Sequence, residues 1–94
     1  MEFEWDKAKA AANFKKHHVT FDEASTVFSD PLARIFDDPE HSAEERREII
    51  AGHSIISRLL LVCFTERDAN VIRIFSAREA TRNERQDYEE NAGG

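Results

Sequence analysis

The segment SRLLLVCFTE, residues 57–66, constrains the fold of this chain more than any other part of it. It is nearly continuous in apolar residues, a pattern typical of a strand whose two faces are both covered. The whole chain has 94 residues, enough for one compact domain and too few for two. We therefore expect this segment to be the central strand of a single small domain.

Other segments of the chain have the pattern of strands and lie at 32–37, 46–53 and 71–77. Residues 2–5, EFEW, alternate polar and apolar side chains and predict a short strand near the N-terminus. The links at 54–57 and 67–70 are short enough for antiparallel hairpins. The sequence thus predicts an antiparallel sheet built around the apolar segment.

Capping patterns predict the helices. Asp6 is a good N-cap for residues 7–17, an alanine-rich run whose last turn is basic. Two capping boxes, in which a threonine precedes a glutamate by three residues, begin two further helices. These pairs are Thr20 with Glu23 and Thr81 with Glu84. The two helices should end near residues 28 and 90.

The predicted element order is β-α-α-β-β-β-β-α, which is typical of an α+β fold. We expect the helices to pack on one face of a twisted antiparallel sheet, leaving the other face partly open to a ligand. A single domain should cover residues 1–90. Residues 91–94, which end in two glycines, should form a flexible tail.

The net charge of −6 is unevenly distributed. Residues 22–45 carry eight of the 19 acids and one of the 13 bases, which leaves eleven acids and twelve bases elsewhere. Nucleic-acid binders usually show a basic excess, so an RNA role must depend on a local cluster of Arg and Lys. The acidic segment could also dock a basic partner.

Several function classes lack their motifs in this sequence. It contains no glycine-rich phosphate loop, no HExxH, no paired CxxC and no GxSxG. Four scattered histidines are weak evidence for a metal, so we expect neither metal nor cofactor. No apolar run approaches the length of a membrane span. We interpret the single cysteine, Cys63, as a small buried apolar residue. A cytoplasmic location is the natural expectation.

The segment VIRIFSAREATRNER, residues 71–85, carries the most informative polar residues. In a regular strand Ile72, Ile74 and Ser76 point one way, whereas Val71, Arg73, Phe75 and Ala77 point the other. The two isoleucines should meet the helices, so that Arg73 projects onto the open face. Burying an unpaired guanidinium is costly, and Arg73 therefore needs an anionic partner.

Arg78 should lie just past the end of this strand. Arginine presents a planar fork of donors that matches phosphate geometry, so both Arg73 and Arg78 are candidate phosphate ligands. The alternative is that they form internal ion pairs with Glu45, Glu48 or Glu66. The residue types alone leave both interpretations open.

A polar cluster precedes the strand at 46–53. A histidine beside glutamates can perform acid–base chemistry near neutral pH, and His41 with Glu45 fits that description. Residues 42–45 equally fit a local helix cap. Arg46 belongs to the same cluster and could contact a ligand.

Five more residues have two interpretations each. Lys16 and His17 could face a phosphate or could complete the cationic end of the first helix. Arg58 and Arg67 lie near opposite ends of the apolar strand, where each could contact a ligand or be a surface charge. Tyr88 could contact a ligand, although packing is the simpler role.

The order of several uncommon motifs matches a known family. Matching stretches lie at 4–31, 41–54 and 71–89, with the strand that begins at Arg58 between the last two. They contain the combinations EWD, NxxKHxVxF, RIxSARxAT and ER. The chain resembles the BrnT family of toxins, which have a RelE-like fold. His18 stands where that family usually has glycine, which implies a tight turn with a positive φ.

The resemblance implies the toxin of a bacterial type II toxin–antitoxin pair. Its expected activity is metal-independent RNA cleavage that inhibits translation, with the RNA 2′-hydroxyl as nucleophile. The expected partner is a ribbon-helix-helix antitoxin of the BrnA type. DNA would be contacted only through that antitoxin, when the complex represses its own operon, and no membrane is involved.

Under this resemblance we expect Arg73 and Arg78 to stabilise the phosphate, with Arg58 in support. His41 or Glu45 is the expected base. The expected RNA contacts are Lys16, His17, Arg46, Arg67 and Tyr88. Two alternatives stay open: an inactive relic that only binds antitoxin, and a regulatory domain with no RNA role.

Overall fold

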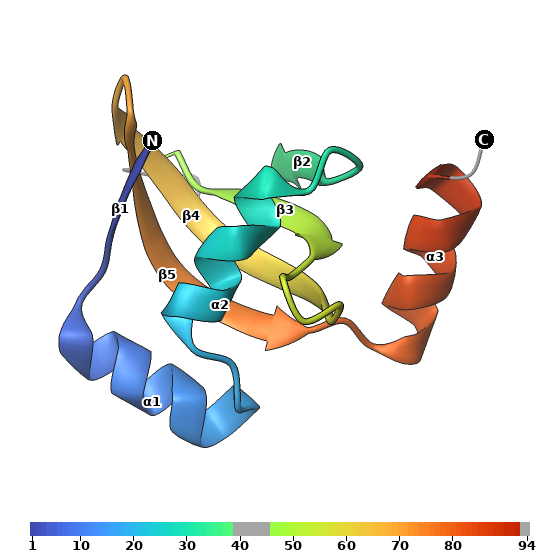
Figure 1. The fold of residues 1–94 in the computed structure, drawn as a ribbon, viewed down its shortest axis with the longest axis horizontal. Coiled ribbons are helices and arrows are strands. Elements are labelled where there is room, and N and C mark those ends of the chain that lie inside the picture. The colour runs from blue at the N-terminus through green and yellow to red at the C-terminus, as the bar shows by residue number, and fades with distance from the viewer. Residues whose placement is uncertain (39–45, 93–94) are drawn as a thin grey trace.

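The computed structural model describes residues 1–38 and 46–92. Within them the elements are β1 (Glu2–Glu4), α1 (Lys7–His17), α2 (Phe21–Thr26), the 3-10 helix η1 (Val27–Ser29), β2 (Arg34–Asp37), β3 (Glu48–His53), β4 (Leu59–Asp68), β5 (Val71–Glu79) and α3 (Arg82–Ala92) (Figure 1). Every predicted helix and strand is present; α1 has the predicted bounds, and the bounds of the others are shifted. The candidate residues His41 and Glu45 lie outside the described residues.

The strands form one sheet in the order β1-β5-β4-β3-β2. The apolar strand β4 lies at its centre, as predicted. Three neighbouring pairs are antiparallel, but β1 pairs with β5 in parallel. The expectation of a fully antiparallel sheet is therefore wrong at this edge. No hairpin joins β1 to β5, so the connection does not dictate an antiparallel arrangement.

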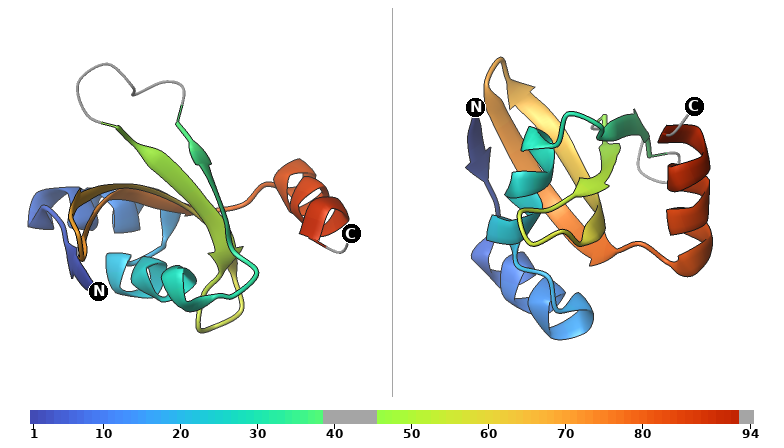
Figure 2. Two further views of the ribbon diagram at one scale, coloured as in Figure 1. Left: turned by 90° about the horizontal axis from the view of Figure 1, so that it is seen from above. Right: turned by 45° about the vertical axis from the view of Figure 1, so that its right-hand side comes forward.

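The helices cover both faces of the sheet, not one as expected. On one face the buried residues Val19, Phe21, Ala24 and Val27 pack on Leu60, Val62 and Ile74. On the other face Tyr88 of α3 packs with Ala51 and Leu59, and Figure 2 shows α3 well apart from α1 and α2. The reason is β4 itself, because alternate apolar residues of this strand face opposite ways and both sets need cover.

The predicted caps are present and explain where the helices begin. Asp6 accepts hydrogen bonds from the backbone N–H groups of Ala8 and Lys9, at 2.8 and 3.1 Å. The Thr20 hydroxyl accepts one from the N–H of Glu23 at 3.0 Å. Helix α3 runs to Ala92, two residues into the segment expected to be a tail.

His18 ends α1 in the left-handed conformation, with φ 58°. This confirms the positive φ expected there. Its N–H donates to the carbonyl of Phe14, which closes the last turn. The chain thereby reverses, and the next residues to be buried are Val19 and Phe21.

The buried side chain of Asn13 joins α1 to the sheet. Its amide nitrogen donates to the carbonyls of Ala77 and Val19, at 2.8 and 3.1 Å, and its oxygen accepts from the N–H of Ala77 at 3.1 Å. Strand β1 pairs with β5 only at 71–73. Asn13 therefore supplies the donor and acceptor that a neighbouring strand would offer to Ala77.

A β-bulge at Phe75 changes the direction of the side chains in β5. Ile74 lies opposite Phe64 and Ser76 opposite Cys63, so Phe75 has no partner in β4. Beyond the bulge Ala77 packs into the core beneath α1 and α2, and Ser76 faces the other way. The regular alternation expected for residues 71–77 is therefore wrong at these two positions.

Asn13→Ala should lower the free energy of unfolding by about 2–4 kcal/mol, because three buried backbone groups lose their partner. Urea denaturation monitored by circular dichroism measures the difference. Asn91→Ala is the matched control, since Asn91 is exposed and its side chain, among the residues that the structure describes, bonds only to Asp87 of α3. A loss for Asn13→Ala no larger than that of the control would contradict the role of this amide.

Candidate functional site

The open part of the sheet carries a pocket of about 650 Å³. Apolar side chains from β3, β4 and β5 form its floor, which consists of Ile49, Leu61, Cys63 and Phe75. Polar side chains surround the floor: Lys9, Lys16, His17, Asp38, Arg47 and Arg78. Four of these are cationic and one is a carboxylate, which gives a formal charge of +3 in a protein of net charge −6. The local basic cluster that RNA binding requires is thus present.

Three segments bring these cations together. Lys16 and His17 lie in the last turn of α1, which Asn13 fixes against β5. Arg78 lies opposite Leu61, on the open face, because the bulge at Phe75 has shifted the alternation by one residue. Without the bulge, Arg78 would point to the opposite face of the sheet, toward α1 and α2. The sequence predicted Arg78 beyond the strand, whereas it lies within β5.

His17 is the group best suited to accept a proton. Its pKa is lowered from the ordinary value of 6.5, chiefly by burial and further by the charges of Lys16, Arg78 and His18. The imidazole is therefore neutral at neutral pH, with a ring nitrogen that can act as a base. The same positive charges that lower this pKa are the groups that could hold a phosphate.

Arg78 is held by a two-point ion pair. Its two Nη atoms donate to the carboxylate oxygens of Glu84, at 2.7 and 2.8 Å. The Thr81 N–H also donates to Glu84, so the predicted capping box is present and is shared with Arg78. These bonds lower the pKa of Glu84 to about 2. Both bonds use Nη atoms. Among the residues that the structure describes, none accepts a hydrogen bond from the Nε–H of Arg78, and this donor can therefore bind a ligand.

Arg73 lies away from the pocket. Its Nη1 donates to Oε2 of Glu4 at 2.8 Å, and Arg67 contacts the same carboxylate at 3.3 Å. The expectation of an anionic partner for Arg73 is confirmed. That partner is Glu4 of β1, and not Glu48 or Glu66 as the sequence suggested. The structure does not bring Arg73 and Arg78 into one pocket.

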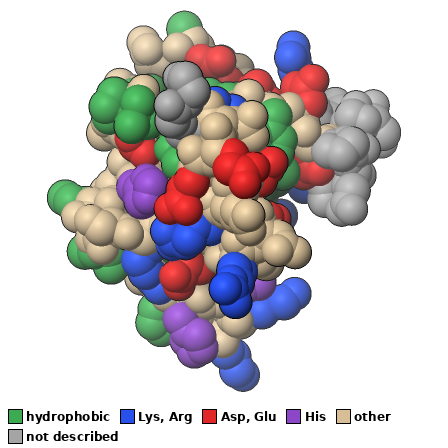
Figure 3. All heavy atoms as spheres, turned by 90° about the vertical axis from the view of Figure 1, so that its right-hand side faces the viewer, with side chains coloured by type: hydrophobic (Ala, Val, Ile, Leu, Met, Phe, Trp, Pro, Cys, Tyr) green, Lys and Arg blue, Asp and Glu red, His purple; other side chains and the backbone are tan. Residues whose placement is uncertain are grey.

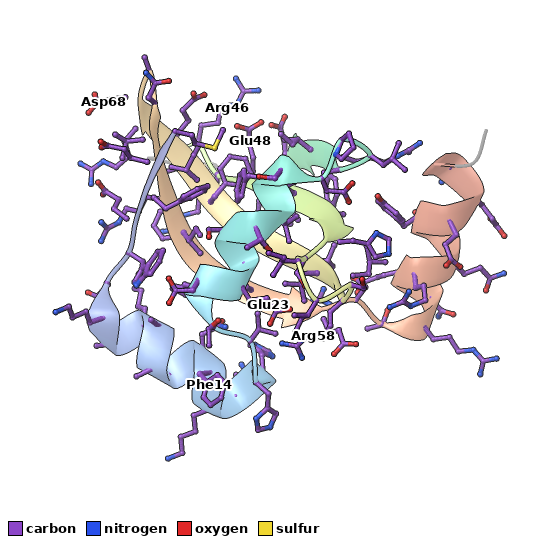
Figure 4. The ribbon with its side chains drawn as sticks, viewed as in Figure 1. Phe14, Glu23, Arg46, Glu48, Arg58 and Asp68 are labelled. Atoms are coloured by element: carbon purple, nitrogen blue, oxygen red, sulfur yellow. The ribbon has the colours of Figure 1, made fainter. Side chains whose placement is uncertain are left out.

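Arg58 links helix and sheet instead of lining the pocket. Its Nε donates to Glu23 at 2.9 Å, a second bond joins Nη2 to the same carboxylate, and Nη2 also donates to the carbonyl of His18 at 3.0 Å. Figure 4 shows Glu23 of α2 beside Arg58. The bond to Arg58 is the main reason why the pKa of Glu23 is lowered.

The remaining predicted residues are also dispersed. Arg46 forms an exposed ion pair with Asp37 at 3.4 Å, and together with Arg67 it lines a separate hollow. Tyr88 is buried, and its hydroxyl donates to the carbonyl of Leu32 at 2.9 Å. Of the predicted site residues that the structure describes, Lys16, His17 and Arg78 line the pocket on the open sheet face, and the others do not.

Four charged or aromatic residues of the pocket were not predicted from the sequence: Lys9, Asp38, Arg47 and Phe75. The guanidinium carbon of Arg47 lies 3.9 Å from the ring centroid of Phe75, and Lys9 Nζ lies 5.4 Å from it. Two signals were available: Lys9 precedes Lys16 by two helical turns and shares its face, and alternation places Phe75 on the open side of the strand with Arg73. Arg47 gave no signal, because only the pairing of the strands brings it beside Phe75.

Cys63 is half-buried in the pocket floor, not fully buried as expected. Burial and the neighbouring Asp38 raise the pKa of its thiol to about 11. The side chain is therefore a neutral thiol at neutral pH. It adds to the apolar floor and is poorly suited to act as a nucleophile.

Positive charge on the surface is local, and acidic and basic side chains are otherwise mixed. Figure 3 shows acidic and basic side chains alternating across one side of the molecule, with Lys, Arg and His side chains gathered toward its lower end. Across residues 1–38 and 46–92, no group of three His, Cys, Asp or Glu is placed to hold a metal ion. In the same part of the chain, no helix is long and apolar enough to cross a membrane.

Comparison with known proteins identifies the family. A family model described as the ribonuclease toxin BrnT of type II toxin–antitoxin systems matches residues 5–84. The chain belongs to the BrnT family. Membership in this family of ribonuclease toxins implies an antitoxin partner. The comparison with curated proteins found no match.

A solved structure has a similar fold. The crystal structure of the Brucella abortus ribonuclease toxin BrnT is similar with a TM-score of 0.67 and 21% sequence identity. The similarity covers 87% of this chain and 99% of that one. At this identity the likeness shows the shared α+β fold.

Glu84→Gln should lower the free energy of unfolding at pH 7 by about 0.5–1 kcal/mol, because the charge that faces Arg78 is lost. The glutamine side chain can still accept the capping hydrogen bond from the Thr81 N–H. The folded-state pKa of Glu84 lies below its ordinary 4.5, so this contribution is complete above pH 4.5 and is lost as the pH falls toward about 2. Denaturation at a series of pH values tests this.

Glu90→Gln is the matched control, since Glu90 on the same helix contacts only the neutral Gln86 among the described residues. Its effect on stability should be small at each pH. If the difference between wild type and Glu84→Gln were the same at pH 7 and at pH 2, the ion pair would not have the role described.

Proposed function

We propose that this toxin cleaves RNA without a metal ion, at the pocket on the open sheet face. The observation that carries the proposal is the placement of His17, with its lowered pKa, beside Lys16 and Arg78. RNA supplies its own nucleophile, so the protein needs only a base and groups that stabilise phosphate charge. The pocket provides both.

The reaction begins when His17 accepts the proton of the 2′-hydroxyl. The 2′-oxygen attacks the adjacent phosphorus, the bond from phosphorus to the 5′-oxygen breaks, and that oxygen takes up a proton from water. The products carry a 2′,3′-cyclic phosphate and a 5′-hydroxyl. Arg78 and Lys16 stabilise the negative charge that develops on the phosphate oxygens.

This assignment changes the roles expected from the sequence. His17, expected to contact RNA, is assigned as the base, and Arg78 keeps the expected role of stabilising the phosphate. Arg73 and Arg58, expected to share that role, are assigned structural roles instead. A base at His41 or Glu45 stays a prediction, because both lie outside the described residues. Contacts of Arg46, Arg67 and Tyr88 with RNA stay predictions as well.

The biological setting follows the family. Cleavage of cellular RNA in the cytoplasm would inhibit translation and arrest growth. A BrnA-type antitoxin with a ribbon-helix-helix fold would neutralise the toxin and connect it to operator DNA. A RelE-like classification of the fold belongs to the same proposal and is supported by the element order and the family.

One observation favours a second candidate function. Arg58, Arg73 and Arg78 each pair with an internal carboxylate. This pairing is what an inactive relic that only binds antitoxin would show. The two functions differ in whether the purified chain cleaves RNA at all.

His17→Asn and Arg78→Ala should each lower the rate of RNA cleavage by about 10²–10⁴-fold, because one removes the base and the other the phosphate charge. Cleavage of a single-stranded RNA is followed by gel electrophoresis in excess EDTA, and the 5′-hydroxyl product is identified by labelling with a polynucleotide kinase. Thermal denaturation of each variant confirms that it is folded.

Arg82→Ala is the matched control, because it removes an exposed arginine of α3 that lies outside the pocket. It should retain cleavage. Full activity of both pocket variants would contradict the proposed site. Absence of cleavage by the wild-type chain, with growth unaffected on expression without antitoxin, would favour the inactive relic.

A further inference from the structure

We propose that the apolar floor of the pocket binds an unpaired nucleobase next to the scissile phosphate, with Phe75 and Arg47 as its stacking partners. This inference rests on the proposed function and names the substrate as single-stranded RNA. It assigns a role to the half of the pocket that phosphate chemistry does not use.

The floor is an apolar surface that the described helices leave largely open, since of its residues only Leu61 packs against the cluster that contains Tyr88 of α3. Ile49, Leu61, Cys63 and Phe75 are half-buried and come from three adjacent strands. Helix α3 covers the same face only farther along, where Tyr88 meets Ala51 and Leu59. A contiguous apolar surface with a polar rim is typical of a ligand site.

Phe75 lies at the bulge and faces this surface, as alternation from Arg73 along the strand predicts. The bulge then turns Arg78 to the same face, so that the ring and the guanidinium line one pocket, and such bulges are common beside functional sites. The Arg47 guanidinium lies over the ring at 3.9 Å, within the range of a cation–π contact. A flat aromatic base can stack on the ring or on the guanidinium plane.

The combination of floor and rim selects the ligand. An apolar floor alone would bind many flat molecules, and a cationic rim alone would bind many anions. Lys16, His17 and Arg78 beside an apolar floor fit a ligand that joins both, which a nucleotide does. The volume of about 650 Å³ lies within the usual range for small-ligand pockets.

The same geometry does not fit a base that is stacked within an RNA duplex. In an RNA duplex both faces of each base are covered by its neighbours, and the base edges lie in grooves. A base that lies on the sheet must be unstacked, which a single strand permits at low cost. The pocket therefore favours single-stranded RNA over a duplex.

Phe75→Leu should raise the KM for a short single-stranded RNA by about 5–100-fold, the range for loss of one base–aromatic stack, with a smaller effect on kcat. Phe75→Trp should restore KM, because an aromatic ring is what the contact requires. Phe36→Leu is the matched control, since Phe36 is an exposed phenylalanine on β2 outside this pocket. It should leave both constants unchanged.

An abasic RNA tests the same contact without any change in the protein. Binding is measured with 2′-deoxyribose at the cleavage position, so that the strand is not cut, and a base is removed on either side of that position in turn. One of the two removals should weaken binding to wild type by the same factor as Phe75→Leu. Combining that removal with Phe75→Leu should add little further loss.

The outcomes separate this inference from the proposed function. If His17→Asn and Arg78→Ala abolish cleavage but Phe75→Leu and both abasic strands behave like wild type, the stacking role is wrong and the cleavage site stands. If duplex and single-stranded RNA are cleaved equally well, the stacking role is also wrong. If the His17 and Arg78 variants retain cleavage, the proposed site itself fails.

Discussion

The side-chain amide of Asn13 takes the place of a missing strand at the edge of β5. Strand β1 ends its pairing at Arg73, and Asn13 then bonds both backbone groups of Ala77. A third bond, to Val19, fixes the turn between α1 and α2. One buried amide thus sets the position of α1 on the sheet, and with it the place of Lys16 and His17.

The bulge at Phe75 acts together with this amide. It turns Ala77 into the core, where its backbone meets Asn13, and turns Arg78 toward the open face. A regular strand would bury Arg78 beneath the helices and leave Ala77 outside. The cationic pocket therefore depends on a local irregularity in β5 and on a single contact across the chain, more than on the overall charge, which is negative.

The sequence predicted the local features of this fold and missed those that depend on distant contacts. Capping at Asp6, Thr20 and Thr81 is encoded within a few residues, so the helices were placed correctly. The ion pair between Glu4 and Arg73 joins residues 69 positions apart, and no local pattern announces it. The bulge was missed because alternation of apolar residues assumes an uninterrupted strand. The predicted Lys16, His17 and Arg78 do line one pocket, whereas their neighbour Arg47 reaches it through strand pairings that the sequence does not show.

The proposed cleavage requires His17 to be a neutral base among cations. Its imidazole signals can be followed by NMR titration in wild type, Lys16→Ala and Arg78→Ala, with and without inorganic phosphate. We predict a pKa below the ordinary 6.5 in wild type, a higher pKa in each variant, and a rise on addition of phosphate, which places an anion beside the ring. A His17 that titrates at 6.5 and responds to neither substitution nor phosphate would contradict the site described.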